Sequence, residues 1–317
     1  VKEHYTVQDA LNKIRKLGRN IENINFIYII DEREKLLDDI NLKELLIVSP
    51  DKKLSEMMDK KYIALHVTDD QEHATSVFRK NNRAVLPVVD DNGILLGIVT
   101  IDDMLRIQSE EDTEDIQKIG GTEALDEPYM STSFRDLIKK RAPWLIILFL
   151  GEMLTASAMS FFEDEIAKAV ILALFIPLII SSGGNSGSQA STLIIRAMAL
   201  GEITFEDWWR VMKREIMSGL VLGGMLGIIG FLRIAVWSSF THVYGDHYML
   251  VGLTVGITLL GVVLWGTLCG SMLPLLLKKI GADPATSSAP FVATLVDVTG
   301  LVIYFVAASL LLRGTLL

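Results

Sequence analysis

The chain has 317 residues, half of them hydrophobic, with a mean hydropathy of +0.38 and a formal net charge of −9. This acidic balance excludes a nucleic-acid binder that works through a basic surface. The single cysteine, Cys269, excludes a disulfide framework or a cysteine metal cluster. Residues 1–140 carry 20 Lys and Arg against 28 Asp and Glu, whereas residues 141–317 carry 10 against 11. The split predicts a soluble acidic module, with a cytosolic N-terminus, followed by a membrane module.

Residues 1–108 resemble two degenerate copies of one α+β unit. Each copy has an amphipathic helix, a β-rich run, an acidic turn, a second strand and a short helix. In the second copy, LPVVDDNGILLGIVTIDD (residues 86–103) contains a hairpin signal and closely resembles the signature of cystathionine-β-synthase (CBS) domains. Such domains work in pairs and sense small ligands, often adenine nucleotides. The resemblance therefore places Thr100 and Asp103 at a nucleotide ribose site, with ATP as a candidate ligand, although the first copy lacks the signature.

An acidic cluster follows the second copy, where EEDTED (residues 110–115) puts five carboxylates in six positions. Composition alone favours a solvated helix face. However, the cluster leads directly into residues 116–140, which enter the membrane module. Like charges this close together need counterions, which divalent cations can supply. A cation-sensing gate is therefore the alternative interpretation.

Five apolar stretches follow Arg141, and each is long enough to cross about 30 Å of hydrocarbon as a helix. Ten Lys and Arg flank them on one side, against Lys168, Arg313 and Arg233 on the other. The positive-inside rule makes the ten-residue side cytoplasmic, which places the N-terminus inside and the C-terminus outside. The predicted spans are residues 143–162, 169–195, 216–240, 248–277 and 284–312.

The second span contains the polar run SSGGNSGSQAST, residues 181–192. Irregular backbone is tolerated at membrane depth only where it is buried in protein or lines a water-filled cavity. The run therefore predicts a helix that is broken at an ion path, with Gly183 and Gly184 permitting unusual torsions. Neutral oxygens for a cation would come from Asn185, Ser186, Ser188 and Gln189.

Asp297 lies about thirteen residues into the fifth span, near the bilayer centre, and that span contains no basic residue before Arg313. A charge at this depth is costly unless it faces water or a partner, so the lone carboxylate predicts a cation path. The alternative is a protonated structural side chain. Oxygen ligands without nearby Cys or His suit Mg²⁺. Glu152 in the first span stays unassigned, and Asp283 is either a helix-start residue or a cation ligand at the mouth of the path.

Together these features resemble the MgtE family of magnesium channels. The matching motifs are TIDDMLRIQSEEDTEDIQKIGG (100–121), PLIISSGGNSGSQASTLIIRAMALGEI (177–203) and DPATSSAPFVATLVDVTGLVIYF (283–305). The resemblance covers essentially the whole chain. Family members commonly carry a helical domain before the CBS pair, which this sequence does not contain, and we expect weaker Mg²⁺-dependent closure for that reason.

The resemblance implies a homodimer with its pore on the dimer axis. Asp297 from both subunits would bind hydrated Mg²⁺, and Gly184 and Ala293 would line the pore. In the family motif GGNxGNQ, Asn185 is retained, but Ser188 replaces the second Asn and offers a shorter oxygen ligand. The cytosolic Mg²⁺-sensing positions, which would hold the linker helix against the pore at high Mg²⁺, are Asp70, Glu72, Asp103, Glu111, Glu114, Asp115 and Asp283.

The sequence therefore predicts an α-helical transmembrane bundle of five helices per subunit, preceded by an α+β cytosolic CBS-domain pair. The predicted boundaries are 1–108 for the CBS pair, 109–141 for an acidic gating linker and 142–317 for the pore domain. The predicted function is a Mg²⁺-selective uptake channel of the plasma membrane, gated by cytosolic divalent cations. One alternative is a Na⁺- or H⁺-coupled divalent-cation transporter, and another is a nucleotide-sensing CBS protein with a membrane anchor. An enzyme is disfavoured, because no nucleophile–base pair or His cluster is apparent.

Overall fold

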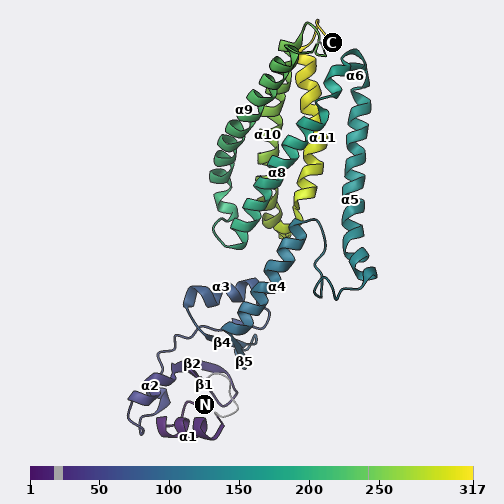
Figure 1. The fold of residues 1–317 in the computed structure, drawn as a ribbon. Coiled ribbons are helices and arrows are strands. Elements are labelled where there is room, and N and C mark those ends of the chain that lie inside the picture. Colours follow the sequence, from purple (N-terminus) through teal and green to yellow (C-terminus); the bar gives the residue numbers. More distant parts are fainter. Residues whose placement is uncertain (18–23, 242, 317) are drawn as a thin grey trace. The chain divides into compact units, whose positions relative to one another are not determined.

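The computed structural model describes residues 1–17, 24–241 and 243–316, without the side chain of Glu72. The predicted sensing role of Glu72 therefore lies outside the described side chains. The chain divides into two compact units, Val1–Asp112 and Thr113–Leu317 (Figure 1). The three-part division at 108/109 and 141/142 stays a prediction.

The first unit is an α+β structure with two small sheets. In one, β1 pairs antiparallel with β2; in the other, β4 pairs parallel with β3 and antiparallel with β5. The elements are α1 (Val7–Leu17), β1 (Phe26–Ile30), β2 (Leu36–Asn41), α2 (Leu42–Ile47), the 3₁₀ helix η2 (Leu54–Glu56), β3 (Leu65–His66), α3 (Gln71–Asn81), β4 (Val85–Val89), β5 (Leu95–Thr100) and α4 (Ile101–Ile119), which continues into the second unit.

The two halves of this unit repeat the same hairpin, as the duplicated sequence predicts. The carboxylates of Asp31 and Asp90 each accept two backbone N–H bonds of 2.8–2.9 Å in the turn after the first strand. Three residues later the backbone enters the left-handed region, at Glu34 with φ 64° and at Gly93 with φ 79°. Glycine adopts this conformation without a steric penalty, so the first copy keeps the turn but has lost its most suitable residue.

Separate apolar cores stabilise the two halves of the first unit. Val7, Ile29 and Leu45 belong to one core, and Phe78 and Leu86 belong to the other. Burial of these side chains supplies the main driving force for folding.

The second unit consists mainly of long helices, and among its described residues five helices are long and apolar enough to cross a membrane. This number confirms the five predicted spans. The elements are α5 (Phe134–Phe161), α6 (Glu163–Lys168), α7 (Val170–Ala173), α8 (Ile176–Ala199), η3 (Phe205–Asp207), α9 (Trp208–Ser238), α10 (Tyr248–Lys279), η4 (Pro284–Thr286) and α11 (Ala289–Leu311).

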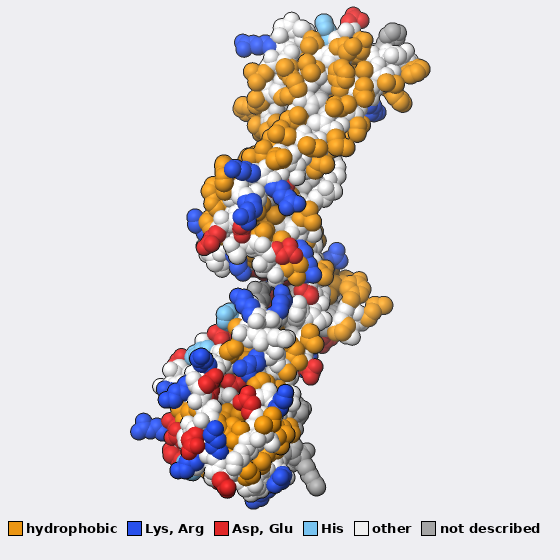
Figure 2. Space-filling view, turned by 90° about the vertical axis from the view of Figure 1, so that its left-hand side faces the viewer, with side chains coloured by type: hydrophobic (Ala, Val, Ile, Leu, Met, Phe, Trp, Pro, Cys, Tyr) orange, Lys and Arg blue, Asp and Glu red, His pale blue; other side chains and the backbone are white. Residues whose placement is uncertain are grey.

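Helices α8, α10 and α11 pack on one another, and α9 packs on α10. The buried side chains of Ile179, Val262, Val296 and Phe305 belong to the core between them. Outside this core, the second unit presents a broad apolar surface, with Lys and Arg side chains gathered towards one end (Figure 2). A surface of this kind suits a bundle surrounded by lipid.

Helix α5 stands to one side of the bundle and contacts α11 (Figure 1). Trp144 Nε1 donates a hydrogen bond of 3.1 Å to Ser288 Oγ. Further along α5, a Cβ added at Gly151 would lie 2.8 Å from Thr294 Cγ2. Of the α5 residues, all of which the structure describes, only Thr155 is buried. Helix α5 is therefore held at a few points along one face.

The predicted break in the second span is wrong, because α8 runs without interruption through residues 181–192. Gly183 and Gly187 of this run serve close packing on α10 instead. A Cβ added at Gly266 would lie 2.4 Å from the carbonyl oxygen of Gly183, and one added at Gly270 would lie 2.0 Å from that of Gly187. Small residues allow helix backbones to approach this closely in lipid, where van der Waals packing drives association.

The interruption in this span lies earlier, between the end of α7 at Ala173 and the start of α8 at Ile176. The buried hydroxyl of Tyr304 on α11 donates a hydrogen bond of 2.9 Å to the carbonyl oxygen of Leu172. Backbone carbonyls inside a membrane must find partners within the protein, and Tyr304 provides one at this interruption.

Candidate functional site

Three of the predicted pore residues meet between α8 and α11. Asp297 is half-buried on α11, and Ala293 lies one turn before it. A Cβ added at Gly184 would lie 3.4 Å from both Asp297 Oδ1 and Ala293 Cβ. Because Gly184 has no side chain and Ala293 has only a methyl group, neither position covers the carboxylate. The arrangement leaves Asp297 accessible to a small polar ligand.

Glu152 on α5 is the site residue whose role the sequence left unassigned. Its side chain is exposed, and its charge acts on Asp297. Among the described residues, neither carboxylate forms an ion pair with a basic side chain. Two carboxylates within electrostatic range of each other repel when both are ionised, and a cation between them relieves that repulsion.

Asn185 and Ser188 are the two polar positions predicted to face the path from α8. Asn185 is exposed, and its Nδ2 donates a hydrogen bond of 3.3 Å to Ser181 Oγ. Ser188 Oγ donates a hydrogen bond of 3.0 Å to the carbonyl oxygen of Ala289, at the start of α11. A hydroxyl that donates its hydrogen still has lone pairs, so Ser188 ties α8 to α11 and keeps an oxygen that can accept.

A second polar centre lies where the end of α4 meets the loop before α11. Lys118 Nζ lies 2.6 Å from Glu114 Oε1 and 2.7 Å from Asp283 Oδ2. The other carboxylate oxygen of Asp283 accepts a hydrogen bond of 2.8 Å from the backbone N–H of Ala285. Burial lowers the pKa of Lys118, but the hydrogen bonds and charges of Asp283 and Glu114 outweigh it and raise the pKa overall. Lys118 is therefore a permanent cation between two carboxylates.

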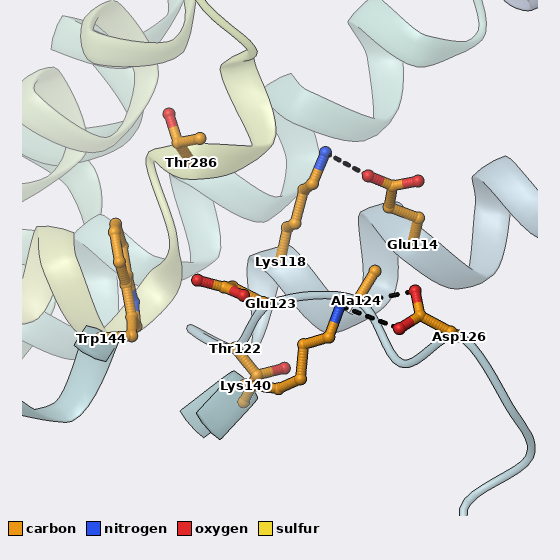
Figure 3. A pocket seen from close by; sticks show the side chains of 9 residues that line it. All are labelled: Glu114, Lys118, Thr122, Glu123, Ala124, Asp126, Lys140, Trp144 and Thr286. Carbon is orange, nitrogen blue, oxygen red and sulfur yellow. Dashed lines mark hydrogen bonds and ion pairs between the residues drawn. The ribbon is translucent and has the colours of Figure 1, made fainter. Parts of the chain in front are cut away.

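This centre borders a pocket of about 360 Å³ (Figure 3). Lys118 and Glu114 point toward each other on one side of the view, and Lys140 is ion-paired with Asp126 at 3.2 Å. Trp144 of α5 forms another part of the lining. Each lysine of the pocket is thus already matched by at least one carboxylate.

The structure brings two of the predicted sensing residues, Glu114 and Asp283, together through Lys118. Among the described residues, no group of three or more His, Cys, Asp or Glu side chains is placed to hold a metal ion. Glu111 and Asp115 are half-buried on α4, and Asp70 is exposed just before α3. Lys118 was not among the predicted site residues, although its i,i+4 spacing from Glu114 indicates an ion pair.

Thr100 and Asp103, the predicted nucleotide contacts, bond to each other at the start of α4. Thr100 Oγ1 donates a hydrogen bond of 2.8 Å to Asp103 Oδ2, and Arg106 Nη2 lies 3.4 Å from Asp103 Oδ1. The hydrogen bond from Thr100 lowers the pKa of Asp103, so its carboxylate is ionised at neutral pH. The pair caps the helix and presents an acceptor beside it.

Comparison with known proteins identifies both parts of the chain. The family model described as "MgtE: Divalent cation transporter" matches residues 176–307, and that of the CBS domain matches residues 54–110. Magnesium transporter MgtE of Thermus thermophilus is 39% identical over 314 residues, which cover 99% of this chain and 68% of that protein. Magnesium transporter MgtE of Enterococcus faecalis is 33% identical over 97% of this chain and 66% of that protein. The chain thus spans about two thirds of the length of these curated relatives.

Two solved structures resemble part of the chain. The soluble part of a magnesium transporter is 29% identical, with a TM-score of 0.34, over 35% of this chain and 43% of that one. The cytosolic domain of the Mg²⁺ channel MgtE in complex with ATP is 34% identical, with a TM-score of 0.33, over 34% of this chain and 43% of that one.

Proposed function

The chain belongs to the MgtE family of divalent cation transporters, and we propose that it carries Mg²⁺ across the plasma membrane as a homodimer. Two relatives named as magnesium transporters align over nearly all of its length. The observation that carries the proposal is that Asp297 lies beside two small residues, Gly184 and Ala293, inside the membrane unit. A carboxylate at that depth is costly unless it faces water or a partner, and a hydrated cation supplies both.

The chemistry of Mg²⁺ fits these residues. Mg²⁺ gives up its water ligands reluctantly and is usually held through one or two carboxylates with several waters retained. Asp297 would accept hydrogen bonds from those waters, and Glu152 would add a second negative charge nearby. Oxygens of Asn185 and Ser188 would accept from the same hydration shell. In a homodimer with the path on its axis, each of these groups occurs twice.

The proposed orientation places the N-terminus in the cytosol and the C-terminus outside. Its support is the gathering of basic side chains at helix ends. Arg196 lies in the last turn of α8, and Lys278 and Lys279 lie in the last turn of α10. By the positive-inside rule, these ends face the cytosol.

We propose further that cytosolic Mg²⁺ closes the path by binding carboxylates of the CBS and linker region. Glu114 and Asp283 support this assignment, because two carboxylates suffice to anchor a hydrated Mg²⁺. Glu111, Asp115, Asp103, Asp70 and Glu72 are the remaining proposed sensing positions. Lys118 pairs with both Glu114 and Asp283, so it holds these two residues together even without Mg²⁺.

Replacing Lys118 with Met tests this role. Without the ammonium group, Glu114 and Asp283 repel each other, so their contact then depends on Mg²⁺. We expect amide hydrogen exchange in residues 113–126 to rise severalfold in Lys118→Met at low Mg²⁺ and to return to the wild-type rate at millimolar Mg²⁺. Lys139→Met is the matched control, because Lys139 is an exposed lysine that pairs with its neighbour Asp136 at 3.5 Å. Equal exchange in wild type and Lys118→Met at low Mg²⁺ would contradict the role of Lys118.

We also propose ATP as a ligand of the CBS unit, at Thr100 and Asp103. Both residues fall inside the CBS-domain match at 54–110. The ionised carboxylate of Asp103 suits this role, because carboxylates accept hydrogen bonds from ribose hydroxyls. Bound nucleotide would supply recognition only, with no part in the cation path.

Flux through the purified chain in liposomes tests the proposed transport and its type. For a channel, we expect Mg²⁺ entry to follow the Mg²⁺ gradient and the membrane potential and to be unchanged when Na⁺ and pH gradients are removed. Empty liposomes, and liposomes with the Asp297→Ala variant, are the controls. Loss of flux on removing the Na⁺ or pH gradient would instead favour a coupled transporter, and no flux from a correctly folded chain would reject the proposal.

A further inference from the structure

A second cavity, on the outer surface of the membrane unit, plays no part in the proposed cation path. It is a groove of about 510 Å³ between η3, α9, α10 and α11, and eight of its nine lining residues are apolar. Several of these are open to the surroundings: Trp208 is 41% exposed and Leu276 is 52% exposed. The groove therefore exposes a contiguous apolar surface, which is typical of a site that binds a ligand or a partner.

The groove lies within membrane-spanning helices and ends at the basic end of the bundle. Cys269 and Lys279 both line it and are ten residues apart on the continuous helix α10, a span of about 15 Å. Its lining on α11 includes Leu295. With these candidate membrane-spanning helices in a bilayer, the groove would face hydrocarbon rather than water, so an acyl chain is the occupant that the medium offers.

Lys279 is the single charged residue of the lining. In the part of the chain that the structure describes, its Nζ lies over the ring of Phe205, 4.6 Å from the centroid, and it is not ion-paired. Lys213 Nζ likewise lies over the ring of Trp209, at 5.1 Å. Aromatic rings and long basic side chains at a helix end are typical of the membrane–water interface. The groove thus combines an apolar floor with an unmatched cation at one end.

We propose that this groove binds an anionic phospholipid, with one acyl chain along α10 and the headgroup phosphate at Lys279. Charge complementarity selects the anionic class, because the rim offers a lysine that lacks a carboxylate partner among the described residues. A basic residue near an anionic lipid surface strengthens binding about fivefold. The proposal is independent of the ion that the chain transports.

The chain provides its own reporter, because Cys269 is its only cysteine and lines the groove. The experiment measures the rate at which N-ethylmaleimide modifies Cys269 in the full chain purified in detergent. Phosphatidylglycerol is added in one arm and phosphatidylcholine with the same acyl chains in another. We expect phosphatidylglycerol to slow modification severalfold at concentrations where phosphatidylcholine has little effect. Glycerol phosphate, which has no acyl chain, is expected not to protect.

Matched variants separate the rim cation from general surface charge. Lys279→Gln is expected to raise the phosphatidylglycerol concentration needed for protection about fivefold. Lys278→Gln, a neighbour in the same helical turn that does not line the groove, is expected to leave it near the wild-type value. If Cys269 reacts too slowly to report, Leu276→Cys in a Cys269→Ser background places the thiol at a more exposed position of the same groove.

Three outcomes would overturn the proposal. Equal protection by the two lipids, or unchanged lipid dependence in Lys279→Gln, would show that the charge of the headgroup does not contribute to binding. Protection by glycerol phosphate, which has no acyl chain, would show that the groove does not need an acyl chain for binding. Protection that grows with protein concentration in the absence of lipid would mean that a second copy of the chain covers the groove.

Discussion

Replacing Asp297 with Ala or Asn is expected to abolish Mg²⁺ uptake, with at least a tenfold loss of flux. The carboxylate lies beside Gly184 and Ala293, which offer no side chain that could take over its charge. Asn keeps the shape and removes the charge, so a loss in both variants assigns the effect to charge rather than to packing. Asp297→Glu keeps the charge on a longer side chain and is expected to retain part of the flux. Uptake is measured in a strain without other Mg²⁺ routes and in liposomes.

Two further substitutions make the Asp297 result interpretable. Asp246→Asn removes an exposed carboxylate from the loop between α9 and α10 and is expected to leave flux unchanged. Glu152→Gln is expected to reduce flux severalfold, because Glu152 acts on the same site from the less tightly packed helix α5. Normal uptake by a correctly folded Asp297→Asn protein would refute the assignment of the path.

The second large effect is expected at Gly270, where Ala should prevent α8 and α10 from packing. The added Cβ would lie 2.0 Å from the carbonyl oxygen of Gly187, which belongs to a helix backbone and cannot rotate away. Overpacking typically costs about 1–3 kcal/mol, and a rigid neighbour puts the cost at the upper end of that range. We expect a large fall in the thermal midpoint of the purified protein. The midpoint is measured by size-exclusion chromatography of samples heated to increasing temperatures.

Gly224 provides the matched control for that substitution. It also lies within a membrane helix, α9, but a Cβ added there would have no atom within 4 Å. Gly224→Ala is therefore expected to leave the thermal midpoint unchanged or slightly raised. A similar midpoint for Gly270→Ala and Gly224→Ala would show that the close approach of α8 and α10 does not contribute to stability.

The sequence predicted the five spans and the CBS unit correctly, because long apolar runs and the hairpin motif at residues 86–103 are local signals. It failed at residues 181–192, where glycines are compatible with either an unwound helix or a close helix contact. Gly266 and Gly270, on a helix about 80 residues away, decide between the two, and no local pattern reveals that pairing. The observed helix is continuous because glycine loses its destabilising effect where another backbone packs on it.

The candidate site was predicted only in part, because some of its residues give a local signal and others are placed by long-range contacts. Asp297 is conspicuous in any hydropathy reading, since a carboxylate in an apolar span is rare. The position of Glu152 depends on how α5 packs on α11, and the bridge from Lys118 to Asp283 joins residues 165 positions apart. Contacts over such separations follow from tertiary packing, which sequence periodicity does not contain.

The sparse packing of α5 has a consequence for biosynthesis. Helix α5 emerges from the ribosome before α8, α9 and α10, whereas Ser288 and Thr294, which it contacts, emerge after them. During that interval α5 resides in the bilayer as a separate span, and Glu152 has no α11 beside it. Because a carboxyl group in hydrocarbon is unfavourable, the arrival of α11 both docks α5 and gives Glu152 its final surroundings. Completion of the proposed cation site therefore waits for α11, which is made after α5, α8, α9 and α10.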